Sequence, residues 1–174
     1  MPEDPGDIQA ELDHRLRGVD PARIVVAGVG NRMRRDDAIG PVLLDALQGS
    51  LPHLIDAGTV PEEYTGVIKR CNPSVIVFLD ALDLGTASGT IRILEPEEIA
   101  DLRRSAHGLS LDLILQYLAG ETGAEVFVIG IQYGEVTSEP GLSPGIQEAV
   151  RICAGMIRSS ILVQKKDIPE ENTL

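Results

Sequence analysis

Two carboxylates and one imidazole, far apart in the chain, are the side chains of this sequence best suited to chemistry. Asp37 ends a glycine-rich segment that starts at Gly28, Asp80 ends an apolar run, and His107 precedes a segment of helical periodicity. Oxygen and nitrogen donors of this kind form mixed metal sites that stay open to further ligands. The sequence therefore predicts a metal-binding site, provided that the fold brings these three side chains together.

Each of these residues also has an alternative explanation. Asp36 or Asp37 could cap the helix that follows, because a carboxylate there accepts a backbone N–H and favours the positive helix end. His107 could be a surface histidine. Gly28-Val29-Gly30 is like the start of a dinucleotide-binding turn, but Met33 stands where the third glycine is needed. Asp80 is harder to explain, because a charge after five apolar residues needs water, a partner or a metal.

Elements that alternate along the chain would position these residues. Apolar runs typical of buried strands occur at 23–28, 53–57, 74–82 and 125–132, and an alternating, more exposed or edge strand at 90–94. Helical periodicity occurs at 39–47, 61–71, 109–119 and 146–161. This alternation predicts an α/β fold with helices on both faces of a mostly parallel sheet. Ligands of such sheets bind beyond the carboxyl ends of the strands, where all three candidates are expected.

Charge and composition exclude several classes of function. With 15 basic and 27 acidic residues the formal charge is −12, which argues against nucleic-acid binding and against a membrane-surface role. No apolar stretch approaches the ~20 residues of a membrane helix, so we expect no membrane insertion. The start of the chain is acidic and lacks the pattern of a signal peptide, so we expect a cytoplasmic protein. Cys71 and Cys153 are far apart, and Cys153 falls on an apolar helical stripe, which predicts a core residue.

The same patterns suggest three parts. Residues 1–20 are predicted to be an acidic N-terminal extension, an appended helix or arm outside the main core. Residues 21–163 form the predicted single α/β domain, and residues 164–174 a polar C-terminal tail that frays.

The ordered motifs of residues 23–163 resemble those of the [NiFe]-hydrogenase maturation endopeptidases. The resemblance starts with Gly28-Val29-Gly30-Asn31, Asp36-Asp37 and Gly40. It continues through Ile55-Asp56-Ala57-Gly58, Pro61-Glu62, Phe78-Leu79-Asp80-Ala81, Gly89-Thr90-Ile91-Arg92, Ser105-Ala106-His107-Gly108-Leu109 and Gly130-Ile131-Gln132. Pro61-Glu62 and the closing segment are most similar to the branch associated with formate hydrogenlyase. Tyr133 departs from the family pattern, since a proline is common there.

The resemblance implies a fold, a reaction and a set of site residues. The fold is a three-layer α/β/α sandwich around a twisted five-stranded sheet. The reaction is removal of a C-terminal peptide from the large-subunit precursor of a [NiFe] hydrogenase after nickel insertion, by an endopeptidase grouped with the aspartic type. By position, the residues that contact the metal would be Asp37, Asp80 and His107. The nickel would arrive with the precursor, so the enzyme needs no permanent metal.

These residue types suit amide hydrolysis. Asp37, Asp80 and His107 could hold the precursor's nickel and align the scissile bond, while Asp37 or Asp80 acts as the general base. Nickel could polarise the carbonyl or only set its position, and residue types do not decide between the two. A non-catalytic nickel-sensing or chaperone-like module that binds hydrogenase precursors would use the same three residues, so motifs alone leave both functions open.

The first and last loops at this edge could contact the precursor. Arg32, Arg34 and Arg35 cluster in an otherwise acidic protein. With Asn31 they are candidates for substrate binding through a precursor carboxylate, although they could simply be solvated charges. The segment 134–144, rich in Gly, Pro, Glu and Ser, is predicted to be a mobile loop that either flanks the peptide groove or is a plain surface connection.

Overall fold

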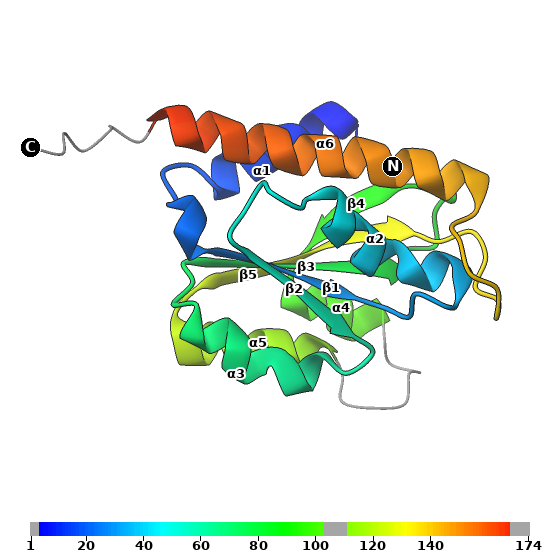
Figure 1. Ribbon diagram of the computed structural model, residues 1–174, viewed down its shortest axis with the longest axis horizontal. Helices are drawn as coiled ribbons and strands as arrows, with labels where there is room; N and C mark the ends of the chain where they lie inside the picture. The colour runs from blue at the N-terminus through cyan, green and yellow to red at the C-terminus, as the bar shows by residue number, and fades with distance from the viewer. Residues whose placement is uncertain (1–3, 103–110, 168–174) are drawn as a thin grey trace, which may run out of the picture.

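A five-stranded sheet forms the centre of the molecule (Figure 1). The computed structural model describes residues 4–102 and 111–167. In the order β2-β1-β3-β5-β4, the strands are His53–Gly58, Ile24–Val29, Val75–Leu82, Glu125–Gln132 and Ile91–Leu94. Neighbouring strands are parallel except β4, which pairs antiparallel with β5 at one edge. The carboxyl ends of β1, β3 and β5 therefore lie together.

Helices cover both faces of the sheet, which confirms the predicted three-layer α/β/α architecture. One face carries α1 (Pro5–Arg15), α2 (Ile39–Ala46) and α6 (Pro144–Asp167). The other carries α3 (Thr65–Arg70), α4 (Pro96–Leu102) and α5 (Leu111–Thr122). Short 3₁₀ turns are η1 (Pro21–Arg23), η2 (Arg35–Ala38) and η3 (Pro61–Tyr64). The predicted helix at 61–71 is thus η3 followed by α3, and α4 was not predicted.

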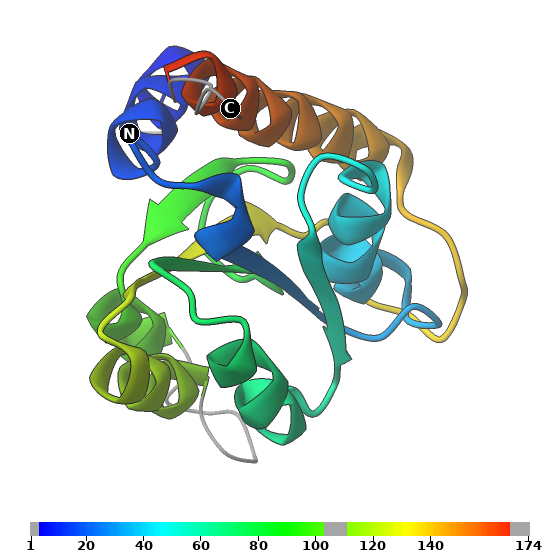
Figure 2. The ribbon, with the colours of Figure 1, turned by 60° about the vertical axis from the view of Figure 1, so that its left-hand side comes forward.

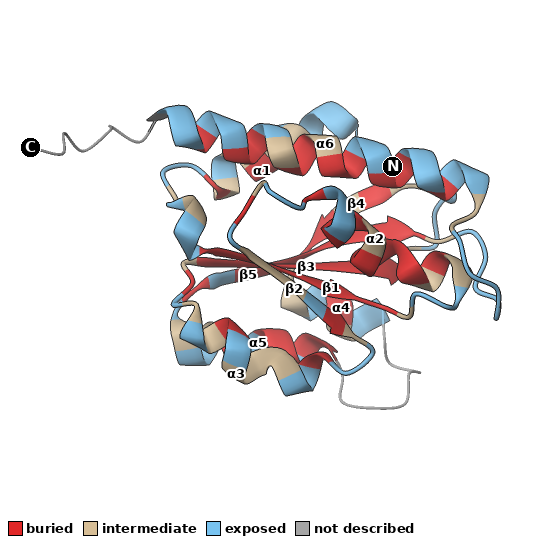
Figure 3. Cartoon of the chain, in the orientation of Figure 1, coloured by how far each residue is buried: buried red, intermediate tan, exposed pale blue. Residues whose placement is uncertain are grey.

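The central strands are apolar throughout because both of their faces are covered. All eight residues of β3 are buried, and they alternate between the two cores: Val77 and Leu79 pack toward α1, α2 and α6, while Ile76 and Phe78 pack toward α3, α4 and α5. Buried residues are concentrated between the layers (Figure 3). A charged residue in this strand, such as Asp80, therefore lies next to a dry interior.

The N-terminal segment belongs to the core, so the prediction that it lies outside the core was wrong. Helix α1 packs beside α6 over the sheet (Figure 2). Ile8, Leu12 and Leu16, spaced by four residues, are each buried to 2% exposure or less. Asp4 caps the helix, since its Oδ1 accepts a 2.9 Å hydrogen bond from Gly6 N. Asp4 and Asp7 are exposed, Asp13 accepts a hydrogen bond from Ser160 of α6, and the apolar stripe joins the main core.

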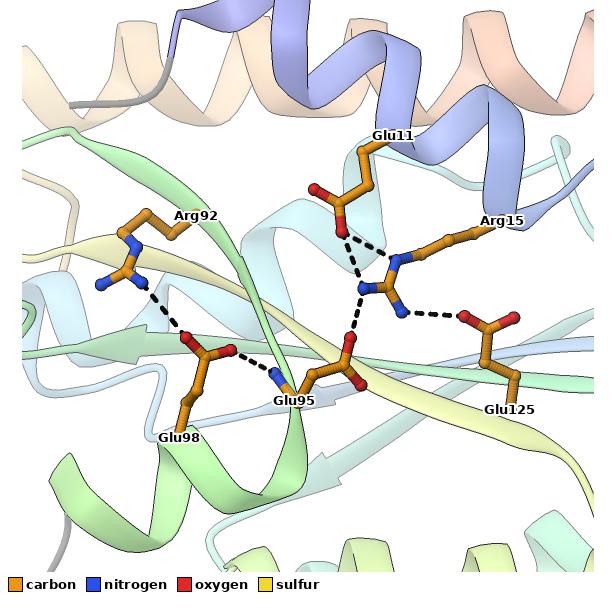
Figure 4. Close-up of polar contacts among 6 residues, drawn as sticks. All are labelled: Glu11, Arg15, Arg92, Glu95, Glu98 and Glu125. Carbon is orange, nitrogen blue, oxygen red and sulfur yellow. Dashed lines mark hydrogen bonds and ion pairs between the residues drawn. The ribbon is translucent and has the colours of Figure 1, made fainter. Parts of the chain in front are cut away.

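A single arginine fastens α1 to the sheet edge (Figure 4). Arg15 Nη1 lies 2.8 Å from Glu125 Oε1, Nη2 lies 2.7 Å from Glu11 Oε1, and Nη2 also bonds Glu95. Its guanidinium carbon is 4.7 Å from the centre of the Phe127 ring. These contacts join the first helix to β5 and to the residue before α4.

The last helix is longer than its apolar stripe predicted. It reaches Asp167, so the polar tail predicted from residue 164 was wrong for its first residues. Gln164 is 2% exposed, and its Oε1 accepts a 2.8 Å hydrogen bond from Gly18 N. Cys153 on the same helix is buried, as predicted, and burial raises the pKa of its thiol to about 12. In the part of the chain that the structure describes, no helix is long and apolar enough to cross a membrane.

Candidate functional site

Two glycines let the first loop lie directly on the strand ends. A Cβ atom at Gly30, whose φ is +143°, would stand 1.9 Å from the carbonyl oxygen of Asp37. A Cβ at Gly40 would stand 2.3 Å from Val29 O and 2.4 Å from Leu79 O. Only glycine permits such approaches. The turn η2 and the start of α2 are therefore pressed onto the ends of β1 and β3.

This contact places Asp37 and Asp80 at the same edge of the sheet. Asp37 lies in η2, directly after β1, and the chain at Gly40 touches the residue that precedes Asp80. Asp80 is 2% exposed and lies near the carboxyl end of β3, opposite Gly130 of β5. The predicted location of both carboxylates, beyond or at the ends of adjacent parallel strands, agrees with this geometry.

The Asp37 carboxylate is half-buried and is oriented by its own loop. Its Oδ2 accepts a hydrogen bond of 3.1 Å from Asn31 N. Asn31 in turn is held by a side-chain contact, since its Oδ1 accepts from Met33 N at 2.9 Å. The turn between β1 and η2 thus fixes Asp37 while leaving it partly accessible.

The third predicted ligand, His107, lies outside the described residues. Among residues 4–102 and 111–167, no three His, Cys, Asp or Glu side chains are placed so that they could hold a metal ion. Two carboxylates at this edge would need at least one further donor to form the predicted trio, and an imidazole suits nickel. The three-ligand site therefore stays a prediction.

The alternative that Asp36 or Asp37 caps the helix was wrong. Helix α2 has Ala38 at its N-cap position and no side-chain hydrogen bond there. Asp36 is completely buried. Its oxygens accept from Gly134 N (2.9 Å), Glu135 N (2.7 Å), Ser143 N (2.8 Å) and Ser143 Oγ (2.7 Å).

These hydrogen bonds outweigh the cost of burial. Burial alone would raise the pKa of Asp36, but the bonds from Glu135, Ser143 and Gly134 favour the ionised form and hold the pKa below its usual value. Sequence reasoning missed this role, because nothing in the chain links residue 36 to a segment about a hundred residues later. The Gly, Pro and Ser content of 134–144 predicted a loop, but it did not indicate that Asp36 binds this loop.

Two of the three arginines predicted to bind substrate are paired within the molecule. Arg32 lies 2.6 Å from Asp45 Oδ2 and 2.9 Å from Asp56 Oδ2. Arg35 Nε lies 3.0 Å from Glu135 Oε2, and its Nη1 lies 3.9 Å from Glu139 Oε2. These carboxylates already offset the charges that were expected to attract the precursor.

Arg34 is exposed, as Arg32 is, whereas Arg35 is half-buried. Asp56, one partner of Arg32, lies near the end of the strand predicted at 53–57, while the other, Asp45, lies in α2. A substrate-binding role for Asn31, Arg32, Arg34 and Arg35 stays a prediction.

A depression of about 300 Å³ lies beside the loop that follows β1. It is lined by Gly30, Asn31, Arg32, Asp56, Gly58 and Thr59. Asn31 connects this depression to the site, because its backbone N–H holds the Asp37 carboxylate. The edge thus combines a fixed, partly exposed carboxylate, a second one in the adjacent strand and a polar hollow, an arrangement suited to binding a peptide and activating water.

Comparison with known proteins identifies a family. Residues 47–160 match the family model HycI, described as hydrogenase maturation protease. The chain is 33% identical over 131 residues to the hydrogenase 3 maturation protease of Escherichia coli K12, covering 72% of this chain and 83% of the relative. It is 31% identical over 121 residues to a putative hydrogenase maturation protease of Methanocaldococcus jannaschii, covering 63% of this chain and 72% of the relative.

Solved structures show the same fold. The crystal structure of a [NiFe] hydrogenase maturation protease HycI from Thermococcus kodakarensis superposes with a TM-score of 0.80 at 30% identity, over 87% of this chain and 99% of that chain. The solution structure of an endopeptidase HycI from Escherichia coli gives a TM-score of 0.70 at 30% identity, over 78% of this chain and 89% of that chain. The chain belongs to the hydrogenase maturation protease family.

Proposed function

We propose that this protein is an endopeptidase that removes a C-terminal peptide from the large-subunit precursor of a [NiFe] hydrogenase once nickel has been inserted. The family and the relatives named as maturation proteases support peptidase activity. The observation that carries the proposal is that Asp37, in the turn after β1, and Asp80, near the carboxyl end of the adjacent parallel strand β3, lie at one edge of the sheet, where Asn31 and Arg32 also line a polar depression. We expect the reaction to take place in the cytoplasm.

In this proposal the nickel is part of the substrate. Asp37, Asp80 and His107 contact the nickel carried by the precursor and thereby set the scissile amide beside them. Carboxylate and imidazole donors suit such a contact, and the protein needs no resident metal. A protein that recognises the inserted nickel would leave nickel-free precursor uncut.

The hydrolytic step needs a general base. Asp37 or Asp80 takes a proton from a water molecule whose oxygen bonds to the amide carbonyl carbon. The C–N bond then breaks, and the leaving nitrogen takes up a proton to become a free amine. Asp37 is the better accessible of the two, because Asp80 is 2% exposed. Grouping with the aspartic-type peptidases would follow if a carboxylate is shown to be this base.

Mass spectrometry of a precursor before and after incubation with the protein tests the proposal. Nickel-loaded precursor should lose a C-terminal peptide, while nickel-free precursor keeps its mass. Asp37→Asn, Asp80→Asn and His107→Gln should each abolish the mass change. Glu148→Gln, which removes an exposed charge paired with Arg151, is the matched control and should process normally.

The same experiment separates the alternative function. A nickel-sensing or chaperone-like module would bind the loaded precursor without changing its mass. Stable binding with no cleavage by the unaltered protein, under conditions in which a known maturation protease cuts its own precursor, would refute the peptidase proposal.

A further inference from the structure

The connection between β5 and α6 is an exposed loop with unusually well-fixed ends. Residues 134–141 are all exposed, and the segment contains two glycines and a proline, a composition typical of mobile loops. Gly134 and Ser143, near the two ends of the connection, nevertheless both donate to one side chain, the buried carboxylate of Asp36. Asp36 therefore holds the two ends of the loop together.

Main-chain contacts strengthen this closure. Asp36 N donates to Glu135 O at 3.1 Å, and Arg35 N donates to Glu139 O at 2.7 Å. Together with the bonds that Asp36 accepts, they fasten the loop at its start, middle and end to the turn η2. The Arg35–Glu135 ion pair lies beside them.

Burying a carboxylate is a costly way to hold a surface loop. A charge removed from water loses its hydration, and this loss is offset only if its oxygens are fully hydrogen-bonded. Asp36 meets this condition with three backbone N–H donors and one hydroxyl. The arrangement selects one loop position, which an apolar residue at 36 could not do.

The fixed position matters because of what lies next to Asp36. Asp37 belongs to the same 3₁₀ turn, and the loop begins directly after β5, the strand that pairs with β3 and its Asp80. The loop therefore stands at the edge of the sheet that carries both candidate catalytic carboxylates. Arg35 and Asp36, which hold the loop, directly precede Asp37 in the chain.

We propose that Asp36 is a positioning residue that holds residues 134–143 as a preformed wall of the precursor-binding site. The inference rests on the proposed function. A loop that is already in place binds a large partner without first being ordered, so anchoring should act on precursor affinity. When the anchored form is only a tenth of the population, apparent affinity falls about tenfold.

Substitutions at both ends of the contact test this role. Asp36→Asn keeps the size of the side chain but replaces one acceptor oxygen by an N–H₂ donor, which cannot accept from the loop. We expect KM for the nickel-loaded precursor to rise about tenfold, with kcat changed less than about threefold. Ser143→Ala removes one of the four bonds and should raise KM about threefold, while Ser143→Thr keeps the hydroxyl and should restore it.

Hydrogen exchange of the loop amides provides a readout that does not depend on the reaction. In Asp36→Asn, the amides of Gly134, Glu135 and Ser143 should exchange faster than in the unaltered protein, while those of β3 keep their rates. Glu148→Gln is the control for both measurements. Its side chain lies on α6 outside the anchored loop, so it should match the unaltered protein in KM and in loop exchange.

The outcomes are distinguishable. If the unaltered protein fails to cut the precursor, the proposed function fails, and this inference with it. If it cuts, but Asp36→Asn shows faster loop exchange with an unchanged KM, only the role of the loop is refuted. If Asp36→Asn does not fold, the Ser143 pair decides: equal KM values for Ser143→Ala and Ser143→Thr would overturn the inference, and a rise confined to Ser143→Ala supports it.

Discussion

The two sides of the turn η2 show opposite uses of the same residue type. On one side, Asp36 is completely buried and accepts four hydrogen bonds from the loop that precedes α6. On the other, Asp37 is half-buried and accepts one hydrogen bond from its own loop. A carboxylate whose acceptor sites are filled holds structure, whereas one with free acceptor capacity can receive a proton or a metal ion. Adjacent aspartates can therefore separate stability from chemistry.

Replacing Asp37 should have the largest effect on activity and a small one on stability. Asp37→Asn removes the proposed base while keeping the size of the side chain and the acceptor for Asn31 N. We expect processing to fall by about 10²–10⁴-fold and the free energy of unfolding to change by less than about 1 kcal/mol. Quantitative mass spectrometry and urea denaturation measure the two. Substantial processing by this variant would remove Asp37 from the mechanism.

Replacing Asp36 should affect stability more than replacing Asp37 does. Asp36→Ala leaves several donors near residues 134–143 without their acceptor, and we expect a loss of about 2–3 kcal/mol in the free energy of unfolding. The Asp37→Ala variant should lose clearly less. Equal losses for the two alanine variants in urea denaturation would show that the contrast between the sides of η2 has no energetic basis.

A charged cluster away from the site provides a reference for purely structural effects. Arg15→Ala removes the contacts of α1 with Glu95 and Glu125 and with the Phe127 ring, which should cost about 1–2 kcal/mol. Processing measured well below the unfolding temperature should be unchanged. A loss of kcat in this variant would show that the N-terminal helix contributes to the site itself.

The smallest effect is expected for Arg32. Its ion pairs with Asp45 and Asp56 are exposed, and such pairs contribute up to about 1 kcal/mol. Arg32→Ala should change stability by less than about 0.5 kcal/mol and precursor KM by less than about threefold. A large, salt-dependent rise in KM would instead support the prediction that this arginine attracts a precursor carboxylate.

Much of the fold could be predicted because it depends on local periodicity. The runs that became β3 and β5 are apolar over their whole lengths, and the helical spacing of α2 and α6 is regular. The location of the site followed from a general property of parallel sheets, namely that loops gather at the carboxyl ends of strands. These inferences need no knowledge of contacts between distant segments.

The predictions that were wrong or incomplete depended on contacts between distant segments of the chain. The acidic charge of residues 1–20 suggested a separate arm, although the spacing of Ile8, Leu12 and Leu16 already marked one apolar face. The polar composition after residue 163 hid the buried contact of Gln164 with Gly18. The role of Asp36 depends on donors from residues 134–143. The errors at Gln164 and Asp36 concern polar side chains whose partners are set only by the folded chain.

The close approach at Gly40 has a consequence for how inactive variants of this protein should be interpreted. Two carbonyl oxygens of the strand ends occupy the space that a methyl group at this position would need. The methyl group of an alanine there would displace the turn η2 from the sheet. The distance between Asp37 and Asp80 would then change although both side chains are unaltered. A screen for lost processing should therefore recover substitutions at Gly40 that retain every ionisable group. The geometry of the site depends on the absence of a side chain at this position.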